Sequence, residues 1–296
     1  MRHIKKYDYS SQIKADLDSE ILGKPYVAEY SDTIDWNSMT GNTDNFLSPL
    51  WVLGYGGQFS ITINSTYPIY YSTDTGETKT WIPYSETITV PGLTQVFFKG
   101  NFTNNNGQKI FTTNGYYIIG GNIFSLVIGD DYLNENYIFT STTDFLRDLF
   151  KGDTYLLNAG SLSMNFIYKI RKTVVAGFSP FHGIFSGCTS LGVAPSYVKY
   201  PENFGSTYNL FRGCTSLTTA PEMIIPNPSR ISHLSNIFRG CSNLSSIKCL
   251  TVGQNLSASN WLSGVSGSGT FTKNKNSTWS SGVGGIPSGW TVVDSE

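Results

Sequence analysis

The chain of 296 residues has a formal net charge of −1, and only 14% of its residues are charged. The weak charge argues against nucleic acid as a partner, and no apolar run approaches the ~20 residues that a membrane-spanning helix needs. The length allows about two domains, and the aromatic content of 14% with 30 glycines is typical of β-rich, turn-rich proteins. We therefore expect a mainly β fold with short helices and no membrane insertion.

Residues 1–50 predict an N-terminal docking arm that includes one short helix, at 11–22. The opening M-R-H-I-K-K-Y-D-Y-S-S lacks the apolar stretch of roughly 7–15 residues that a signal peptide needs, so we expect no export by the usual route if Met1 is the true start. Two interpretations stay open: a partly disordered leader, or an arm that becomes ordered on a neighbouring protein. We favour the second, with aromatic anchors at Tyr7, Tyr9, Tyr26 and Trp36.

Residues 51–140 predict a small β-sandwich. The segment 58–64 alternates apolar and polar residues, and 86–100 fits two strands around a turn at Pro91–Gly92. Short strands with turns about every 8–12 residues are typical of a sandwich. Further strands are expected at 68–78, 109–112, 116–120 and 122–128.

Residues 141–255 predict a short leucine-rich-repeat solenoid, which begins with a helix. Thr142 or Thr143 can cap a helix over 143–150, and we expect this helix to form the N-terminal cap and first coil of the solenoid. The apolar side chains that share one face of this helix are Phe145, Leu146, Leu149 and Phe150.

Three near-copies of one motif follow, at 185–195, 211–221 and 238–247. They read F-S-G-C-T-S-L-G-V-A-P, F-R-G-C-T-S-L-T-T-A-P and F-R-G-C-S-N-L-S-S-I, at steps of 26 and 27 residues. A fixed period of this length is the mark of a leucine-rich-repeat solenoid, in which each repeat buries its apolar side only against its neighbours. The glycine two residues after each Phe predicts a turn with a positive φ. Like residues should stack in columns, which gives a predicted repeat core of Phe150, Phe185, Cys188, Leu191, Phe211, Cys214, Leu217, Phe238, Cys241 and Leu244.

The four cysteines allow a disulfide interpretation because their number is even. Cys188, Cys214 and Cys241 occupy equivalent slots of successive repeats, however, so a buried column of reduced thiols is favoured over pairs. Cys249 completes the set. We expect no metal site and no cofactor, since the sequence has no C-x-x-C and its three histidines are scattered.

Residues 256–296 predict a β-rich C-terminal cap. The segment is rich in Gly and Ser, which by composition alone indicates a flexible linker. Large aromatic residues that interrupt it at intervals favour a folded cap with two or three strands instead. These apolar residues are Trp261, Phe271, Trp279, Ile286 and Trp290.

The motif F-x-G-C-T-S-L-x-x-A-P resembles the leucine-rich repeat of Bacteroides surface proteins, a subtype also known from treponemes. The resemblance covers 185–250, and F-K-G-D-T-Y-L at 150–156 looks like a first repeat with Asp153 in the cysteine slot. The tail at 261–271 and 285–292 is similar to the closing segment of such proteins. The phrase G-K-P-Y-V-A-E-Y at 23–30 also looks like the start of head and tail proteins of crAss-like bacteriophages.

No nucleotide-binding, zinc-protease or EF-hand motif is present, and the chain is not expected to be an enzyme. Asp130 and Asp131 are adjacent carboxylates, but neighbouring side chains in a strand or turn point apart, so a surface turn is the expected role. Without these motifs, the sequence offers no catalytic residues and directs attention to binding.

Two functions follow from the resemblance. The first is a structural or decoration protein of a virion (capsid, tail or fibre component), anchored to other virion proteins by its arm, homo-oligomeric, and displaying the repeats for adhesion to a host surface glycan or protein. The second is a bacterial cell-surface adhesin or glycan-binding protein. In either case the candidate ligand surface comprises Tyr197, Tyr200, Tyr208 and Arg230.

Overall fold

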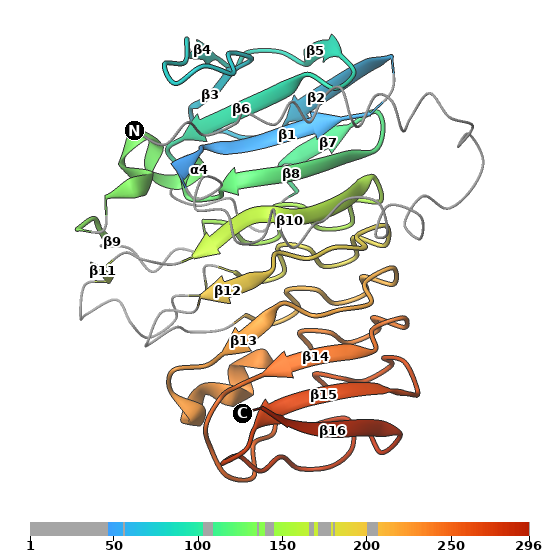
Figure 1. Ribbon diagram of the computed structural model, residues 1–296. Helices are drawn as coiled ribbons and strands as arrows, with labels where there is room; N and C mark the ends of the chain where they lie inside the picture. Colours follow the sequence, from blue (N-terminus) through green and yellow to red (C-terminus); the bar gives the residue numbers. More distant parts are fainter. Residues whose placement is uncertain are drawn as a thin grey trace, which may run out of the picture.

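The computed structural model describes residues 47–55, 57–102, 109–134, 136–139, 145–165, 169–170, 179, 181–199 and 207–295. This part of the chain is mainly β, as expected. It contains a sheet of eleven strands in the order β16-β15-β14-β13-β12-β10-β8-β1-β6-β3-β4, a three-stranded sheet in the order β5-β2-β7, and the pair β11-β9 (Figure 1). No helix among the described residues is long and apolar enough to cross a membrane.

The N-terminal end of the molecule is built from antiparallel strands. In the large sheet these are β1 (Leu50–Gly54), β3 (Ile69–Ser72), β4 (Ile82–Pro83), β6 (Gln95–Gly100) and β8 (Tyr117–Asn122). The small sheet holds β2 (Gln58–Ile63), β5 (Ile88–Pro91) and β7 (Phe111–Thr113). Alternate residues of β2 and β5 are buried, so each strand gives one face to the core and one to solvent.

The two strands on either side of the Pro91–Gly92 turn do exist, but they do not pair with each other. β5 pairs with β2 in the small sheet, whereas β6 pairs with β1 and β3 in the large one. The turn therefore carries the chain from one layer to the other.

The strand expected at 122–128 is wrong, because the chain turns there and forms the short helix α4 (Ser125–Ile128). Gly121 has a φ of 78°, and the Asn122 side chain accepts a hydrogen bond from the Phe124 amide at 3.0 Å. The Ser125 hydroxyl then donates to the Phe98 carbonyl at 2.9 Å, which fixes α4 against β6. After α4 come the 3-10 helix η1 (Gly129–Leu133), β9 (Ile138–Phe139) and β11 (Lys169–Ile170).

The large sheet continues without a break from the antiparallel strands at the N-terminal end into the parallel strands that follow. β10 (Leu156–Asn165) pairs in parallel with β8 on one side and with β12 on the other (Figure 1). The remaining parallel strands are β12 (Tyr197–Lys199), β13 (Glu222–Ile224), β14 (Ser246–Cys249), β15 (Gly269–Asn274) and β16 (Trp290–Ser295). The boundary expected near residue 140 is thus crossed by a common sheet, and one hydrophobic cluster runs from Leu50 to Trp290.

The helix expected at 143–150 is not formed in its described part. Residues 145–150 form turns, and Asp148 has a φ of 58°, which an α-helix does not accommodate. The Asp148 and Phe150 amides donate to the carbonyls of His182 and Ile184 instead of to carbonyls of their own segment. The apolar residues of the segment are buried as the pattern indicated, namely Phe145, Leu146, Leu149 and Phe150.

Five such segments lie one above another, and we call them the stacked turns: 149–153, 184–188, 210–214, 237–241 and 261–265. The backbone amide of each Phe donates to the next turn, as in Phe185 to Leu210 and Phe211 to Ile237 at 2.9 Å. Phenylalanine rings form a column through them with neighbouring centroids 5.4–5.7 Å apart; its members are Phe150, Phe185, Phe211 and Phe238.

The cysteine column is also present in the stacked turns. The thiols of Cys188, Cys214 and Cys241 donate to the carbonyls of the preceding turn, at 3.0, 3.1 and 3.0 Å. All four cysteines are free and buried, and Cys249 lies apart from the column in β14. Burial raises the pKa of each thiol, that of Cys241 to about 12.

The glycines of the repeats adopt the expected backbone. Gly187, Gly213 and Gly240 have φ angles of 78°, 75° and 78°. A second column of left-handed residues lies two positions before each Phe and was not expected from the sequence. Its members are Asp148, Gly183, Asn209, Asn236 and, before Leu262, Asn260.

The C-terminal segment is folded and contributes β15 and β16, as the aromatic spacing predicted. The Trp261 and Trp279 rings stack 4.9 Å apart, and the Trp261 indole donates to the Gly285 carbonyl at 2.9 Å. The Trp290 indole donates to the Ser266 carbonyl at 2.8 Å. The last turns are therefore covered by aromatic side chains.

The 3-10 helix η2 (Pro228–Leu234) lies in the connection that follows β13. The Asn227 side chain caps this helix by accepting a hydrogen bond from the Ser229 amide.

Candidate binding site

The predicted ligand surface is only partly visible. Tyr208 is 38% exposed and lies just before the stacked turn at 210–214. Its ring is edge-on to that of His182, with the ring centroids 6.2 Å apart. Arg230 lies in η2. Tyr197 belongs to β12, but only its backbone is described, and Tyr200 lies outside the described residues. The four anchors of the arm, Tyr7, Tyr9, Tyr26 and Trp36, also lie outside them.

His182 lies beside Tyr208 at the surface of the stacked turns. Burial lowers the pKa of His182, and the positive charge of Arg147 lowers it further. Its neighbour Asp148 is nearly buried and accepts a hydrogen bond from Lys151 at 3.1 Å. The Lys151–Asp148 ion pair thus lies close to His182, whose ring contacts that of Tyr208.

Asp153 occupies the cysteine slot of the first stacked turn and is fully buried. Its carboxylate pairs with Lys109 at 2.9 Å and accepts a hydrogen bond from the Tyr117 hydroxyl at 3.0 Å. A third bond comes from the Tyr155 amide at 2.8 Å. Burial, with Asp153 close by, raises the pKa of Tyr117 well above its usual value. These contacts satisfy the carboxylate and join β8 and Lys109 to the first stacked turn.

The adjacent carboxylates Asp130 and Asp131 lie in η1 at the surface. Asp130 is bound by Lys99 at 2.7 Å, and its side chain is 80% exposed. Among the described residues, no group of three or more His, Cys, Asp or Glu side chains could hold a metal ion. Asp130 therefore forms an ion pair at the surface.

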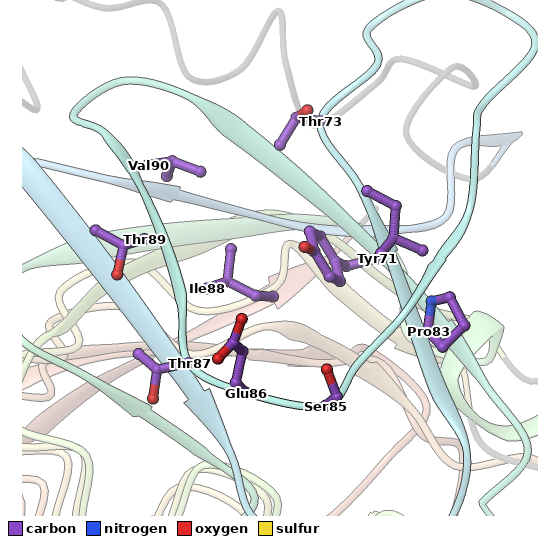
Figure 2. A pocket seen from close by; sticks show the side chains of 10 residues that line it. Tyr71, Thr73, Pro83, Ser85, Glu86, Thr87, Ile88, Thr89 and Val90 are labelled. Atoms are coloured by element: carbon purple, nitrogen blue, oxygen red, sulfur yellow. The ribbon is translucent and has the colours of Figure 1, made fainter.

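An open hollow of about 510 Å³ lies at the β4 edge of the large sheet, and we call it the edge pocket (Figure 2). It is lined by Tyr71, Thr73, Ile82 and Pro83 on one side and by residues 85–90 on the other. β4 is the last strand of the large sheet, and β5 is the last strand of the small one. The edge pocket therefore lies where the edges of the two layers meet.

Some polar side chains that line the edge pocket have hydrogen-bond partners, and others do not. The Thr87 hydroxyl is within hydrogen-bonding distance of Thr62 at 2.9 Å, and that of Thr89 is 3.3 Å from Ser60. Within the part of the chain that the structure describes, the Glu86 carboxylate and the Tyr71 hydroxyl make no hydrogen bond. Both are labelled in Figure 2, with Tyr71 on β3 and Glu86 on the segment before β5.

The sequence did not single out the edge pocket, because its residues are ordinary for a strand hairpin and its shape depends on how two sheet edges meet. Tyr71 pairs in register with Ile82 in β4 and with Phe98 in β6, which fixes its position at the sheet edge. Comparisons of the chain with protein-family models, with curated proteins and with solved structures found no match.

Proposed function

We propose that this chain is a non-enzymatic structural or decoration protein of a bacteriophage virion, which displays a leucine-rich-repeat solenoid for adhesion. The repeated F-x-G-C motif, the rings stacked at 5.4–5.7 Å and the parallel strands β12–β16 support the solenoid. The observation that carries the proposal is the uninterrupted sheet from β4 to β16. A shared sheet and core make the sandwich and the repeats one stiff body, which suits a part that holds a binding surface away from its support.

In this proposal the arm attaches the chain to other virion proteins through Tyr7, Tyr9, Tyr26 and Trp36, and several copies assemble on one particle. Aromatic side chains suit this role because they give large contact areas and dominate many interfaces. The stacked turns and the edge pocket then face outward toward a host surface glycan or protein.

The proposal is tested by mass spectrometry of purified phage particles from a host that carries the gene. We expect peptides of this chain in particles banded in a density gradient, at a constant ratio to the major capsid protein. Presence of the chain only in unbanded lysate protein would contradict a place in the virion.

The role of the arm is tested by replacing Tyr7, Tyr9, Tyr26 and Trp36 together with Ala. We expect the variant to fold but to be lost from banded particles. The matched control replaces four tyrosines of the described surface instead, and it should be retained: Tyr70, Tyr116, Tyr155 and Tyr208.

The second candidate function is a bacterial cell-surface adhesin or glycan-binding protein. The edge pocket favours it, because an open hollow with unoccupied polar groups is a place for a small ligand. Protease shaving of intact cells separates the two: release of peptides from this chain by uninfected cells supports the adhesin.

A further inference from the structure

We propose that the edge pocket binds a short, neutral oligosaccharide through Glu86 and Tyr71. This inference rests on the adhesive part of the proposed function and names the ligand class of the site. It does not depend on whether the chain is carried by a virion or by a cell.

The size of the edge pocket fits a small ligand. Its volume of about 510 Å³ lies within the roughly 300–1,000 Å³ of typical ligand sites. One wall includes Tyr71 of β3 with Ile82 and Pro83 of β4, and the other runs from the bend at 85–87, which carries Glu86, into β5. Strands hold their groups at fixed positions, so the Tyr71, Ile82 and Pro83 side of the hollow is preformed.

The chemistry of the lining matches the two faces of a sugar ring. The Glu86 carboxylate can accept hydrogen bonds from two sugar hydroxyls, and the Tyr71 hydroxyl can donate one or accept one. Neither group has a hydrogen-bond partner among the described residues, so a ligand does not have to displace one. Ile82, which is 45% exposed, and Pro83 give an apolar surface for the C–H face of the ring.

The charge of the lining excludes acidic ligands. Glu86 is the one ionisable carboxylate among the residues that line the edge pocket, and no Lys, Arg or His lies among them. An anionic sugar would meet this negative charge without a compensating cation, which costs binding free energy. A neutral polyol meets no such opposition.

Addition of a peptide strand is disfavoured by the two sheet edges. β4 has two residues and β5 has four, and each strand contains a proline, Pro83 or Pro91. A proline lacks the amide N–H that a new strand would need, and short edge strands with proline are a common protection against strand addition. The ligand must therefore bind through side chains, as an oligosaccharide does.

The experiment applies the full chain to an immobilised panel of neutral and acidic oligosaccharides, and the best neutral ligand is then titrated by calorimetry. We expect binding to neutral members, with Glu86→Gln weakening affinity about tenfold because a charged hydrogen-bond acceptor is lost. Tyr71→Phe removes only one hydroxyl and should weaken affinity severalfold. Glu77→Gln is the matched control: it removes an exposed carboxylate outside the edge pocket, and it should bind as the unchanged chain does.

Three results would overturn the proposal. One is no binding to any neutral member, detected by saturation-transfer NMR at millimolar ligand. Another is equal affinity of the unchanged chain and both pocket variants while Tyr208→Ala or Arg230→Ala abolishes binding, which would move the adhesive surface to the repeats and leave the proposed function standing. The third is preferential binding of acidic oligosaccharides or of a basic peptide. Melting curves of each variant establish that it is folded.

Discussion

Asp153 stands where the three following turns carry a cysteine, and it joins the first stacked turn to Lys109 and to Tyr117 of β8. Its buried carboxylate holds Lys109 and the Tyr117 hydroxyl, so its removal leaves both without their partner. We expect Asp153→Ala to lower the free energy of unfolding by about 3 kcal/mol. Urea denaturation measures the loss.

The control is Asp130→Ala, which removes an exposed carboxylate that also binds one lysine. Exposed ion pairs contribute about 0–1 kcal/mol, so this variant should remain close to the unchanged chain. Equal losses in the two variants would show that the Asp153 pair stabilises no more than a surface contact does.

The buried thiols predict a loss of stability at high pH. In the folded chain the pKa of Cys241 is about 12, whereas a thiol in the unfolded chain ionises near its ordinary value of 9.0. The folded state keeps the proton longer, so the stabilisation is complete below pH 9 and is lost as the pH rises toward 12. The last stacked turn has Val265 at the position that Cys241 holds in the turn before it. We therefore choose Cys241→Val, which should reduce the fall of the unfolding free energy above pH 9 by about 1.4 kcal/mol per pH unit.

The measurement is urea denaturation of both chains from pH 8 to pH 11, and parallel profiles would argue against a buried thiol. A thiol reagent gives an independent check at neutral pH. It should label all four cysteines only after denaturation, because each is buried in the folded chain.

Single positions were predicted with mixed success. The positive φ of Gly187, Gly213 and Gly240 followed from their place after each Phe, because only glycine adopts it at little cost. The left-handed Asn209 and Asn236 were missed, since asparagine is common in loops of every conformation. The partners of Asp153 were missed as well, because Lys109 and Tyr117 lie 44 and 36 residues away in the sequence.

The phenylalanine column holds neighbouring turns together by ring stacking and burial. Phe211 lies between Phe185 and Phe238, with near-parallel planes 7° apart on both sides. We expect Phe211→Ala to cost about 4 kcal/mol of unfolding free energy, because a cavity replaces a fully buried ring.

Phe211→Leu is the milder companion variant, because Leu262 fills the equivalent position of the last stacked turn. It should cost about half as much as the alanine variant or less, since leucine leaves a smaller cavity. Both losses are read from urea denaturation, and an equal loss would mean that stacking geometry matters more than filled volume.

The alternation of apolar and polar residues indicated which segments form strands, but it did not indicate which strands pair with each other. β2, β5 and β6 were foreseen from alternation and turn residues, yet the assignment of β5 and β6 to different sheets depends on contacts distant in sequence. The apolar face of 145–150 was correct, but the helix was wrong, because the amides of Asp148 and Phe150 donate to carbonyls of the next turn and not to carbonyls of their own segment. An apolar spacing that suits a helix also suits a stacked turn.

The C-terminal segment should be essential to the whole molecule. A chain that ends after residue 255 loses β15, β16 and Trp261, which leaves the turn at 237–241 uncovered. We expect this chain to be insoluble or to melt at a sharply lower temperature, because an uncovered repeat end exposes apolar surface. A chain that ends after Asp294 keeps the contact to Lys273 and is the control.

The outcome is read from the soluble fraction and from thermal melting followed by circular dichroism. An unchanged melting temperature of the chain ending after residue 255 would contradict the covering role. At this scale the mainly β class was predictable from composition, whereas the sheet that runs from β4 to β16 was not. The pairing of β8 with β10 joins segments that carry no common pattern.

The hydrogen bonds between successive turns have one further consequence. Each turn donates backbone amides to carbonyls of the next turn, and its own carbonyls accept amides of the turn before it. The amides of Phe185, Phe211 and Phe238 follow this pattern. Duplication of the 27 residues 211–237 would therefore insert a complete layer and leave both ends intact. Every such insertion would lengthen the molecule by about 4.8 Å, one strand spacing. The length of the molecule can thus evolve in fixed increments, while the structure on either side of the insertion stays unchanged.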